Sequence, residues 1–267
     1  MRDSSGINIL GGVSVMSKSS VSVVVRGHRI VTILFAVIIF ALPACSTSPR
    51  PTPEHPMDGD VWLRGVPHYD LNFDCQLASP PGSGSHEEQE EMKDILSWQD
   101  KRTPEETARA TSEAKVSLES FFGPPNGTLS DTDLVVLRPL FDKVRWSADI
   151  AAHAAKLRWK RIRPFVYDKR VHPPFEVAST SLSYPSGHST IAWTFAPVLK
   201  SLFPKQAQAF QKRAEQIALD RVIAGVHHPS DVRAGKECGG QVFDALNKNS
   251  EFLSDLKSAE KALVRRR

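Results

Sequence analysis

Apolar residues recur at three- and four-residue intervals along most of the chain after residue 84, which is the spacing of amphipathic helices. Few stretches alternate with the two-residue period of strands, and no internal repeat is present. Together with capping signals, the spacing predicts helices over residues 85–101, 103–122, 130–159, 187–199, 205–222 and 229–246, the third kinked or split at Pro139. The pattern therefore predicts an all-α fold, a single-domain helical bundle.

The N-terminal segment has a different pattern. Basic residues precede an apolar run of 13 residues, from Ile30 to Leu42 and interrupted only by Thr32, which is short for a membrane span and typical of an export signal. The run ends at Leu42-Pro43-Ala44-Cys45, which resembles a bacterial lipobox. We therefore predict a lipoprotein signal peptide over residues 1–45 and lipidation of Cys45. An uncleaved anchor or an ordinary secretory signal is the alternative.

Removing residues 1–45 leaves 222 residues, enough for one domain with a hydrophobic core, and lowers the formal net charge from +4 to +1. Because the basic excess belongs mostly to the signal, we predict no nucleic-acid partner. Residues 46–84 are rich in Pro, Gly and Ser and predict a tether and lead-in. The folded domain is then expected over residues 85–250, followed by a basic tail over residues 251–267.

Export also bears on the cysteines. If Cys45 carries lipid, Cys75 and Cys238 remain, and two such residues often pair in an oxidising compartment. A disulfide between Cys75 and Cys238 is the prediction, with two buried thiols as the alternative.

Two cations form the first of three blocks that carry chemistry. Lys156 and Arg163 lie seven residues apart, so on a helix they share nearly the same face. Pro164 disfavours helix at the residue before it, which places the Arg163 guanidinium at a helix end. The alternative interpretation is a solvated basic face, shared with the intervening Arg158, Lys160 and Arg161.

The second block, Pro185-Ser186-Gly187-His188, predicts the start of a helix. Ser186 fits the N-cap, and the amides of Gly187 and His188 would be free donors there. A helix N-terminus binds anions, and Gly187 lets the backbone approach a phosphate closely. A plain capped helix with an incidental histidine is the alternative.

Arg221, His227 and Asp231 form the third block. A carboxylate four residues after a histidine can orient the ring and stabilise its cationic form. His228, next to His227, raises the alternative of a metal site, but the acidic clusters of a phosphatase metal pair are missing nearby. The three blocks together supply cations, amide donors, a nucleophile and a proton carrier, and predict a pocket for a tetrahedral oxyanion. We expect neither a metal nor another cofactor.

In order and spacing, the three blocks resemble the signature of the phosphatidic acid phosphatase type 2 (PAP2) superfamily, which includes bacterial class A non-specific acid phosphatases and vanadium haloperoxidases. The resemblance covers roughly residues 80–245 and implies the helical bundle of that superfamily. It implies that His227 attacks phosphorus to form a phosphohistidine, that Asp231 orients His227, and that His188 transfers the proton. The implied phosphate ligands are Lys156, Arg163, Ser186, Gly187 and Arg221.

Three positions depart from the family pattern. Asp220 stands where a serine precedes the arginine, and a carboxylate there could pair with Arg221 and weaken oxyanion binding. Leu182 and Ser189 replace the glycine and threonine that flank the second block in class A acid phosphatases. Membership of the superfamily is therefore indicated more firmly than the subclass.

The expected function is an exported, metal-independent acid phosphatase in the bacterial periplasm. Its expected partners are a small phosphomonoester and the membrane, through the lipid anchor or the N-terminal segment; a homo-oligomer is left open. A vanadium-dependent haloperoxidase or a lipid phosphatase would use the same pocket. The non-enzymatic alternative is an envelope lipoprotein with a degenerate phosphate-binding pocket.

Overall fold

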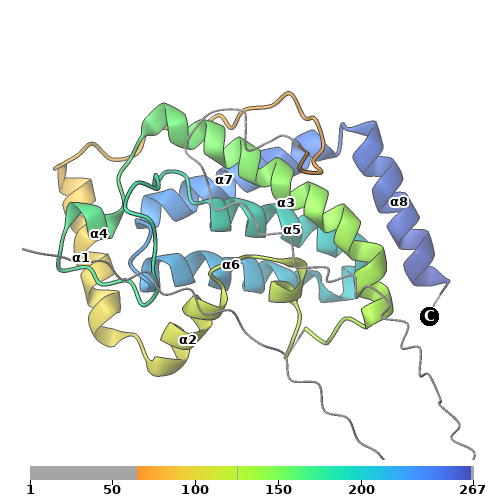
Figure 1. Ribbon diagram of the computed structural model, residues 1–267, viewed down its shortest axis with the longest axis horizontal. Helices are drawn as coiled ribbons and strands as arrows, with labels where there is room; N and C mark the ends of the chain where they lie inside the picture. Colours follow the sequence, from red (N-terminus) through yellow and green to blue (C-terminus); the bar gives the residue numbers. More distant parts are fainter. Residues whose placement is uncertain (1–64, 125, 266–267) are drawn as a thin grey trace, which may run out of the picture. The chain divides into compact units, whose positions relative to one another are not determined.

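The computed structural model describes residues 65–124 and 126–265, and within these ranges it is helical with no strand (Figure 1). The all-α prediction is confirmed. The predicted signal peptide and Cys45 lie outside the described residues. The elements are α1 His86–Lys101, α2 Pro104–Ser112, η2 Leu118–Phe121, α3 Asp131–Trp159, α4 Pro164–Tyr167, α5 Gly187–Leu202, η3 Pro204–Gln206, α6 Ala207–Ile223, α7 Pro229–Leu246 and α8 Ser250–Val264.

Hydroxyl caps account for the starts of the first three α-helices. Ser85, Thr103 and Ser130 each accept a hydrogen bond from the backbone amide three residues later, which satisfies a donor that has no partner inside the helix. The third of these helices, α3, continues through Pro139 without a break. The carbonyl that loses its usual donor there belongs to Val135, which is 74% exposed, so water can hydrate it.

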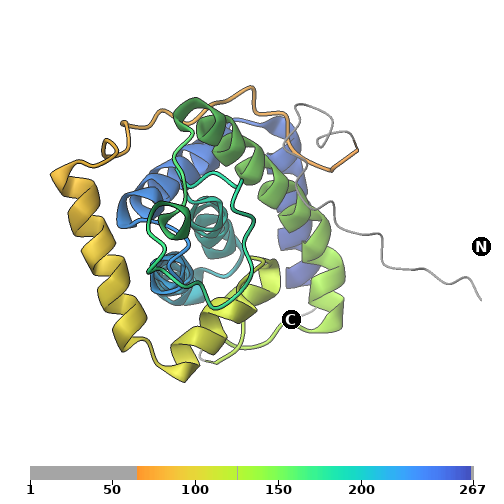
Figure 2. The same ribbon diagram turned by 60° about the vertical axis from the view of Figure 1, so that its left-hand side comes forward.

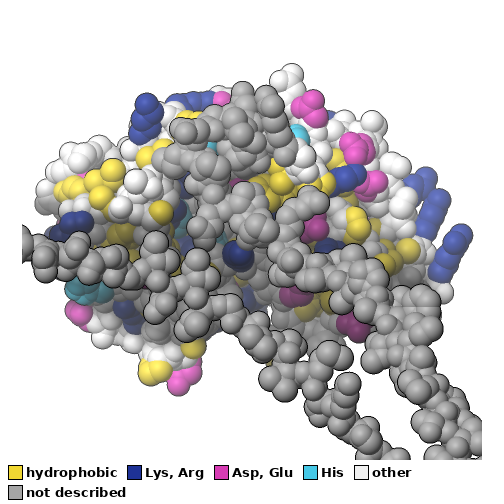
Figure 3. Space-filling view, viewed as in Figure 1, with side chains coloured by type: hydrophobic (Ala, Val, Ile, Leu, Met, Phe, Trp, Pro, Cys, Tyr) yellow, Lys and Arg dark blue, Asp and Glu magenta, His cyan; other side chains and the backbone are white. Residues whose placement is uncertain are grey.

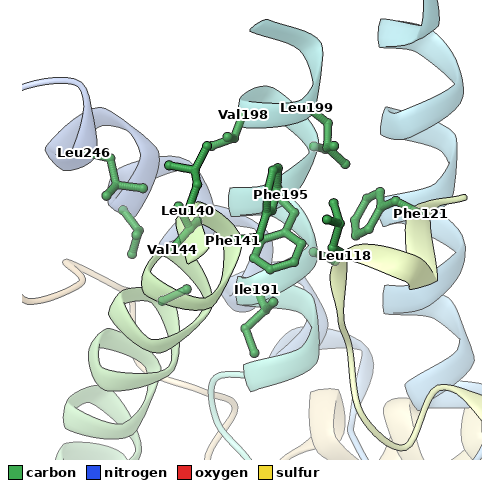
Figure 4. Packing of buried hydrophobic residues seen from close by; sticks show 14 of the residues in the cluster. Leu118, Phe121, Leu140, Phe141, Val144, Ile191, Phe195, Val198, Leu199 and Leu246 are labelled. Atoms are coloured by element: carbon green, nitrogen blue, oxygen red, sulfur yellow. The ribbon is translucent and has the colours of Figure 1, made fainter. Parts of the chain in front are cut away.

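Helix α5 is the central element of the bundle. It packs against α3, α6 and α7, and Figure 2 shows it in the middle of the surrounding helices. Its ring contact with α3 is between Phe195 and Phe141, whose centroids lie 4.9 Å apart in an edge-to-face arrangement (Figure 4). Leu118 and Phe121 of η2 close the core beside α5. The rigid packing around α5 fixes the position of its N-terminal end, where the second block lies.

Glycines let α5 and α7 approach each other closely. A Cβ on Gly235 would lie 2.6 Å from the carbonyl oxygen of Ser186, and one on Gly239 would lie 2.6 Å from that of Thr190. Both glycines are on α7, four residues apart and therefore on one face. Helix α7 thus contacts the backbone of the first turn of α5 directly.

The helix predicted over residues 103–122 is wrong at its C-terminal end, because α2 ends at Ser112. The amide of Ala114 donates to the carbonyl of Thr111 at 3.1 Å, which tightens the last turn. The carbonyls of Ala110 and Ala114 are then free of helical partners. Two side chains of the candidate site donate to them.

A helix also stands where the sequence predicted a basic tail. Asn249 caps α8, and Phe252, Ala259 and Leu263 are buried on one face of it. This spacing is that of an amphipathic helix, which the terminal arginines obscured. On the face shown in Figure 3, acidic and basic side chains lie beside one another along α8, where Lys143 of α3 contacts two carboxylates.

The lead-in segment packs on the domain from residue 65 onward. Tyr69 is buried, and its hydroxyl donates to Asp255 of α8 at 2.9 Å. Cys75 and Cys238, the pair predicted from the sequence, are joined by a disulfide bond that fixes this segment to α7. In the part of the chain that the structure describes, no helix is both long enough and apolar enough to cross a membrane.

Candidate functional site

The three blocks meet around the N-terminal end of α5. Lys156 lies in the last turn of α3 and Arg163 just before α4. Ser186 caps α5, whose first turn holds Gly187 and His188. The remaining residues come from the other side of the fold: Arg221 from the last turn of α6, His227 from the connection to α7, and Asp231 from the first turn of α7. The structure thus brings together every residue that the resemblance placed in the catalytic and phosphate-binding sets.

His227 is held in one orientation by contacts on both ring nitrogens. Its Nε2 lies 2.7 Å from Nη1 of Arg163, a group that only donates, so Nε2 carries the lone pair. Its Nδ1 lies 3.3 Å from Oδ2 of Asp231 and therefore carries the proton. The basic nitrogen of this buried ring consequently faces the cations, while the carboxylate holds the other nitrogen.

Backbone carbonyls hold the cations of the first block. Nζ of Lys156 donates to the carbonyls of Leu182, Ser183 and Pro185 at 2.8, 3.1 and 2.6 Å. Arg163 also donates to the carbonyl of Val226 at 2.8 Å. Among the residues that the structure describes, no carboxylate forms an ion pair with Lys156 or Arg163, which favours an anionic ligand.

Helix α2 and the turn that follows it supply contacts to the other two blocks. Nη2 of Arg221 donates to the carbonyl of Ala110 at 2.6 Å. Nε2 of His188 donates to the carbonyl of Ala114 at 3.0 Å. A carbonyl only accepts, so Nε2 of neutral His188 carries the proton, and Nδ1 is the atom left to exchange a proton with a ligand.

Burial and positive charge keep both histidines neutral in the free protein. Burial, followed by the charge of Arg221, lowers the pKa of His188 to about 3. Burial, followed by the charge of Arg163, lowers the pKa of His227 well below its usual range. Burial and then repulsion by Arg163 likewise lower the pKa of Lys156. The pocket therefore strongly disfavours additional positive charge.

Asp231 has the opposite electrostatic environment. Burial by itself would raise the pKa of this carboxyl group, but hydrogen bonds from His227 and His228 lower it well below its usual range. Asp231 is consequently a buried carboxylate that stays ionised. An ionised carboxylate has no proton to donate, so both of its oxygens act as acceptors and Oδ2 can accept the hydrogen bond from His227 Nδ1.

The first turn of α5 presents the N-terminal geometry predicted for the second block. The hydroxyl of Ser186 accepts from the amide of Ser189 at 3.3 Å. The amide of Ser186 donates to the carbonyl of Asp231 at 2.8 Å, which joins the starts of α5 and α7. The amides of Gly187 and His188 belong to the turn whose donors have no helical acceptor.

Asp220 pairs with a different arginine from the one that the sequence suggested. Its two oxygens accept from Nε and Nη2 of Arg109 on α2, both at 2.8 Å. This bidentate pair neutralises the buried carboxylate away from Arg221. The carboxylate that approaches Arg221 is Glu113, with Oε2 3.8 Å from Nη2. Burial raises the pKa of Glu113 to about 7.

Sequence reasoning missed two residues that contact Asp231. Arg161, assigned to a solvated face, is 7% exposed and donates from Nη1 to Oδ1 of Asp231 at 2.9 Å. Ser183 donates its hydroxyl proton to Oδ2 at 2.5 Å. Neither is signalled by local spacing, because Arg161, between α3 and α4, and Ser183, in the loop before α5, reach Asp231 only through tertiary packing against α7. In the described ranges, no His, Cys, Asp and Glu side chains are grouped to hold a metal ion.

Comparison with known proteins agrees with the geometry. Residues 146–242 match the PAP2 superfamily. The chain is 29% identical to an acid phosphatase of Zymomonas mobilis over 198 residues, covering 72% of this chain and 75% of that enzyme. It is 31% identical to a non-specific acid phosphatase of Providencia stuartii over 131 residues, covering 45% of this chain and 50% of the relative.

A shorter similarity points to another phosphatase. The chain is 42% identical to a lipid A 1-phosphatase of Rhizobium etli over 67 residues, which is 25% of this chain and 29% of that protein. The resemblance to the PAP2 superfamily predicted from the three blocks is confirmed. The predicted class, a phosphoric monoester hydrolase, agrees with the names of the relatives.

Proposed function

We propose that this protein is an exported acid phosphatase that hydrolyses phosphate monoesters without a metal, through a phosphohistidine on His227. One observation carries the proposal: the lone pair of His227 Nε2 faces the cations, while Nδ1 donates to an ionised carboxylate. A nucleophile in that state can attack a phosphorus atom whose oxygens are held by the same cations.

In the first step, Nε2 of His227 attacks phosphorus, and the bond from phosphorus to the ester oxygen breaks. Lys156, Arg163 and Arg221 stabilise the charge on the equatorial oxygens. His188 gives its Nδ1 proton to the leaving alcohol. The products are an alcohol, a phosphohistidine and neutral His188.

The second step returns the enzyme to its starting state. Nδ1 of His188 takes a proton from water, the resulting oxygen attacks phosphorus, and the bond from phosphorus to Nε2 of His227 breaks. Inorganic phosphate leaves. Throughout both steps, Asp231 keeps the Nδ1 proton of His227 in place and stabilises the charge that the ring gains on phosphorylation.

Hydrolysis of p-nitrophenyl phosphate in excess chelator tests this function. We expect turnover that chelator leaves unchanged, an acid-labile phosphoprotein after quenching, and loss of both in His227→Ala. His86→Ala is the matched control, because this histidine is exposed on α1 and its ring lies 3.7 Å from Glu90. Activity that chelator removes and added metal restores would contradict the proposal, as would turnover by His227→Ala.

We also propose export and lipid anchoring, supported by the basic residues, the apolar run and the Cys45 that ends it. Labelling cells with radioactive palmitate is expected to mark the wild-type protein and not Cys45→Ala. An unlabelled wild type, or a labelled variant, would contradict lipidation.

A lipid phosphate is the second candidate substrate. The similarity to a lipid A 1-phosphatase over 67 residues favours it, and a membrane tether would bring such a substrate within reach. A panel of nucleotides, sugar phosphates and lipid phosphates at several pH values separates the two. Higher kcat/KM on the lipid phosphates than on the soluble monoesters would select the second candidate.

A further inference from the structure

We propose that Arg161, anchored by Glu91 of α1, is a positioning residue that fixes Asp231 and thereby keeps His227 in its reactive tautomer. The inference rests on the proposed function and extends it to helix α1, which lies outside the residues matched by the PAP2 superfamily.

The two oxygens of Asp231 have separate roles. Oδ2 accepts from Ser183 and from the ring of His227, and also from the backbone amide of His228 at 2.8 Å. Oδ1 accepts from Nη1 of Arg161 at 2.9 Å. Because Arg161 holds the second oxygen, rotation of the carboxylate away from His227 would break a charge-assisted hydrogen bond.

Arg161 is itself fixed by acidic residues of α1. Its Nη2 donates to Oε2 of Glu91 at 2.9 Å and to Oε1 of Glu88 at 3.4 Å. Glu91 Oε1 also accepts from the amide of Ser230 at 2.6 Å, next to Asp231 in the first turn of α7. Nη1 of Arg161 also donates to the hydroxyl of Ser230 at 2.7 Å, so Arg161, Glu91 and Ser230 are all hydrogen-bonded to one another. The guanidinium therefore binds the helix that carries Asp231 at two points.

These contacts separate Arg161 from the phosphate ligands. Both of its terminal nitrogens already donate to α1 and α7, whereas the cations of the three blocks have no carboxylate in bidentate contact. A buried ion pair is in general weak evidence for stability. Stability alone therefore does not explain why the Arg161 guanidinium is held between α1 and α7. Orientation of Asp231 does explain it, because a planar guanidinium with several donors can fix the direction of a carboxylate better than a lysine ammonium can.

The test compares Arg161→Gln and Arg161→Lys with Arg170→Gln, which changes an exposed arginine paired with the neighbouring Asp168. At metal sites, the outer partners that orient a ligand are typically worth about 10–100-fold in affinity or activity, and we expect an effect of similar size here. We expect Arg161→Gln to lower kcat on p-nitrophenyl phosphate by at least about tenfold with KM within about threefold. The kcat of Arg161→Lys should lie between those of Arg161→Gln and the wild type, and the kcat of Arg170→Gln should equal that of the wild type.

A double-variant cycle distinguishes positioning from general support of the fold. If Arg161 acts through Asp231, Arg161→Gln should lower kcat much less in an Asp231→Asn background than in the wild type. Additive effects would overturn the proposal, as would kcat within twofold of the wild type in a folded Arg161→Gln. Should that variant not fold, Glu91→Gln replaces it, with a loss of kcat expected and the same outcomes overturning the proposal.

A readout independent of turnover separates this proposal from the proposed function. In ¹⁵N-histidine-labelled protein, with the signal assigned by His227→Asn, we expect His227 as the Nδ1–H tautomer in the wild type and a mixture in Arg161→Gln. If the wild type is inactive but Arg161→Gln changes the His227 tautomer in this way, the result contradicts the proposed phosphatase activity and supports the positioning role. An unchanged tautomer in Arg161→Gln overturns the positioning role whatever the activity.

Discussion

His188 is the residue whose charge state changes most between the free site and the reaction. In the free protein, burial and Arg221 hold its pKa at about 3, so it is mostly neutral at mildly acidic pH. The proposed mechanism needs it protonated at the first step. A bound phosphate resolves this conflict, because its negative charge offsets the cations that depress the pKa. The substrate therefore helps to create the acid that acts on it.

The pKa of His188 is accordingly predicted to rise when an oxyanion binds. A charge about 4 Å away at an effective dielectric constant near 20 is worth about 4 kcal/mol, or about 3 pKa units. Titration of the His188 NMR signal should give a value near 3 in the free protein, and one about 3 units higher with inorganic phosphate or tungstate. An oxyanion-bound pKa equal to the free value contradicts the prediction.

The same depressed pKa affects the pH dependence of folding. Between its ordinary value near 6.5 and about 3, His188 is neutral in the folded chain and protonated in the unfolded chain. The unfolded state then binds more protons, so the contribution of His188 to stability is present above pH 6.5 and is lost as the pH falls towards 3. Acid conditions that favour catalysis by His188 thus also weaken the fold around it.

At this scale, the sequence predicted the reacting groups but not the groups that orient them. Lys156, His188 and His227 are recognisable because their spacing reflects contact with one small ligand. Arg161 has no such signature, since it is one of several basic residues in a row and is buried only because α1 folds over it. Asp220 illustrates the same limit, because its partner Arg109 lies 111 residues away.

Among the helices, the contact between α5 and α7 determines where the anion-binding turn lies. Gly235 contacts the carbonyl of Ser186, the residue that caps α5 and donates to the carbonyl of Asp231. The helices at this contact were predictable from apolar spacing and caps. Their close approach, and the early end of α2, were not, because each depends on a neighbour that is distant in sequence.

Gly235→Ala is predicted to damage activity, with Gly240→Ala as its matched control. An added Cβ at Gly240 meets nothing within 4 Å, so the higher helix propensity of alanine should raise the free energy of unfolding by about 0.5–1 kcal/mol. At Gly235 the Cβ would be 2.6 Å from backbone, and overpacking should cost about 1–3 kcal/mol.

The activity of the two glycine variants distinguishes a local effect from a general one. Because the displaced atom belongs to Ser186, kcat/KM of Gly235→Ala should fall by about tenfold or more, consistent with misplacement of a binding group by a fraction of an ångström. Gly240→Ala should keep the wild-type value. Equal kcat/KM in the two variants, measured well below their unfolding temperatures, would exclude a role for this contact in the site.

For the molecule as a whole, the disulfide connects the lead-in segment to the helix that carries Asp231. Cys75 and Cys238 are 163 residues apart and both fully buried. This pairing was predictable because only two cysteines remain after the proposed lipid anchor. The way the lead-in crosses the bundle was not, since a segment rich in Pro and Gly carries no periodic signal.

Removing the disulfide is predicted to lower stability without changing the chemistry. Closing a loop of this length restricts the unfolded chain by about 5 kcal/mol in the chain-entropy model, an upper value because residual structure in the unfolded state reduces it. Urea unfolding of Cys75→Ala/Cys238→Ala should therefore give a free energy of unfolding several kcal/mol below that of the oxidised wild type. Neither cysteine is among the site residues, so kcat should stay within about twofold under folding conditions.

Reduced wild type should match the double variant in stability, because both lack the same constraint. If reduction leaves the wild-type unfolding curve unchanged, the bond does not restrict the unfolded chain. A large loss instead ties stability to an oxidising compartment, where the proposed export signal would deliver the protein.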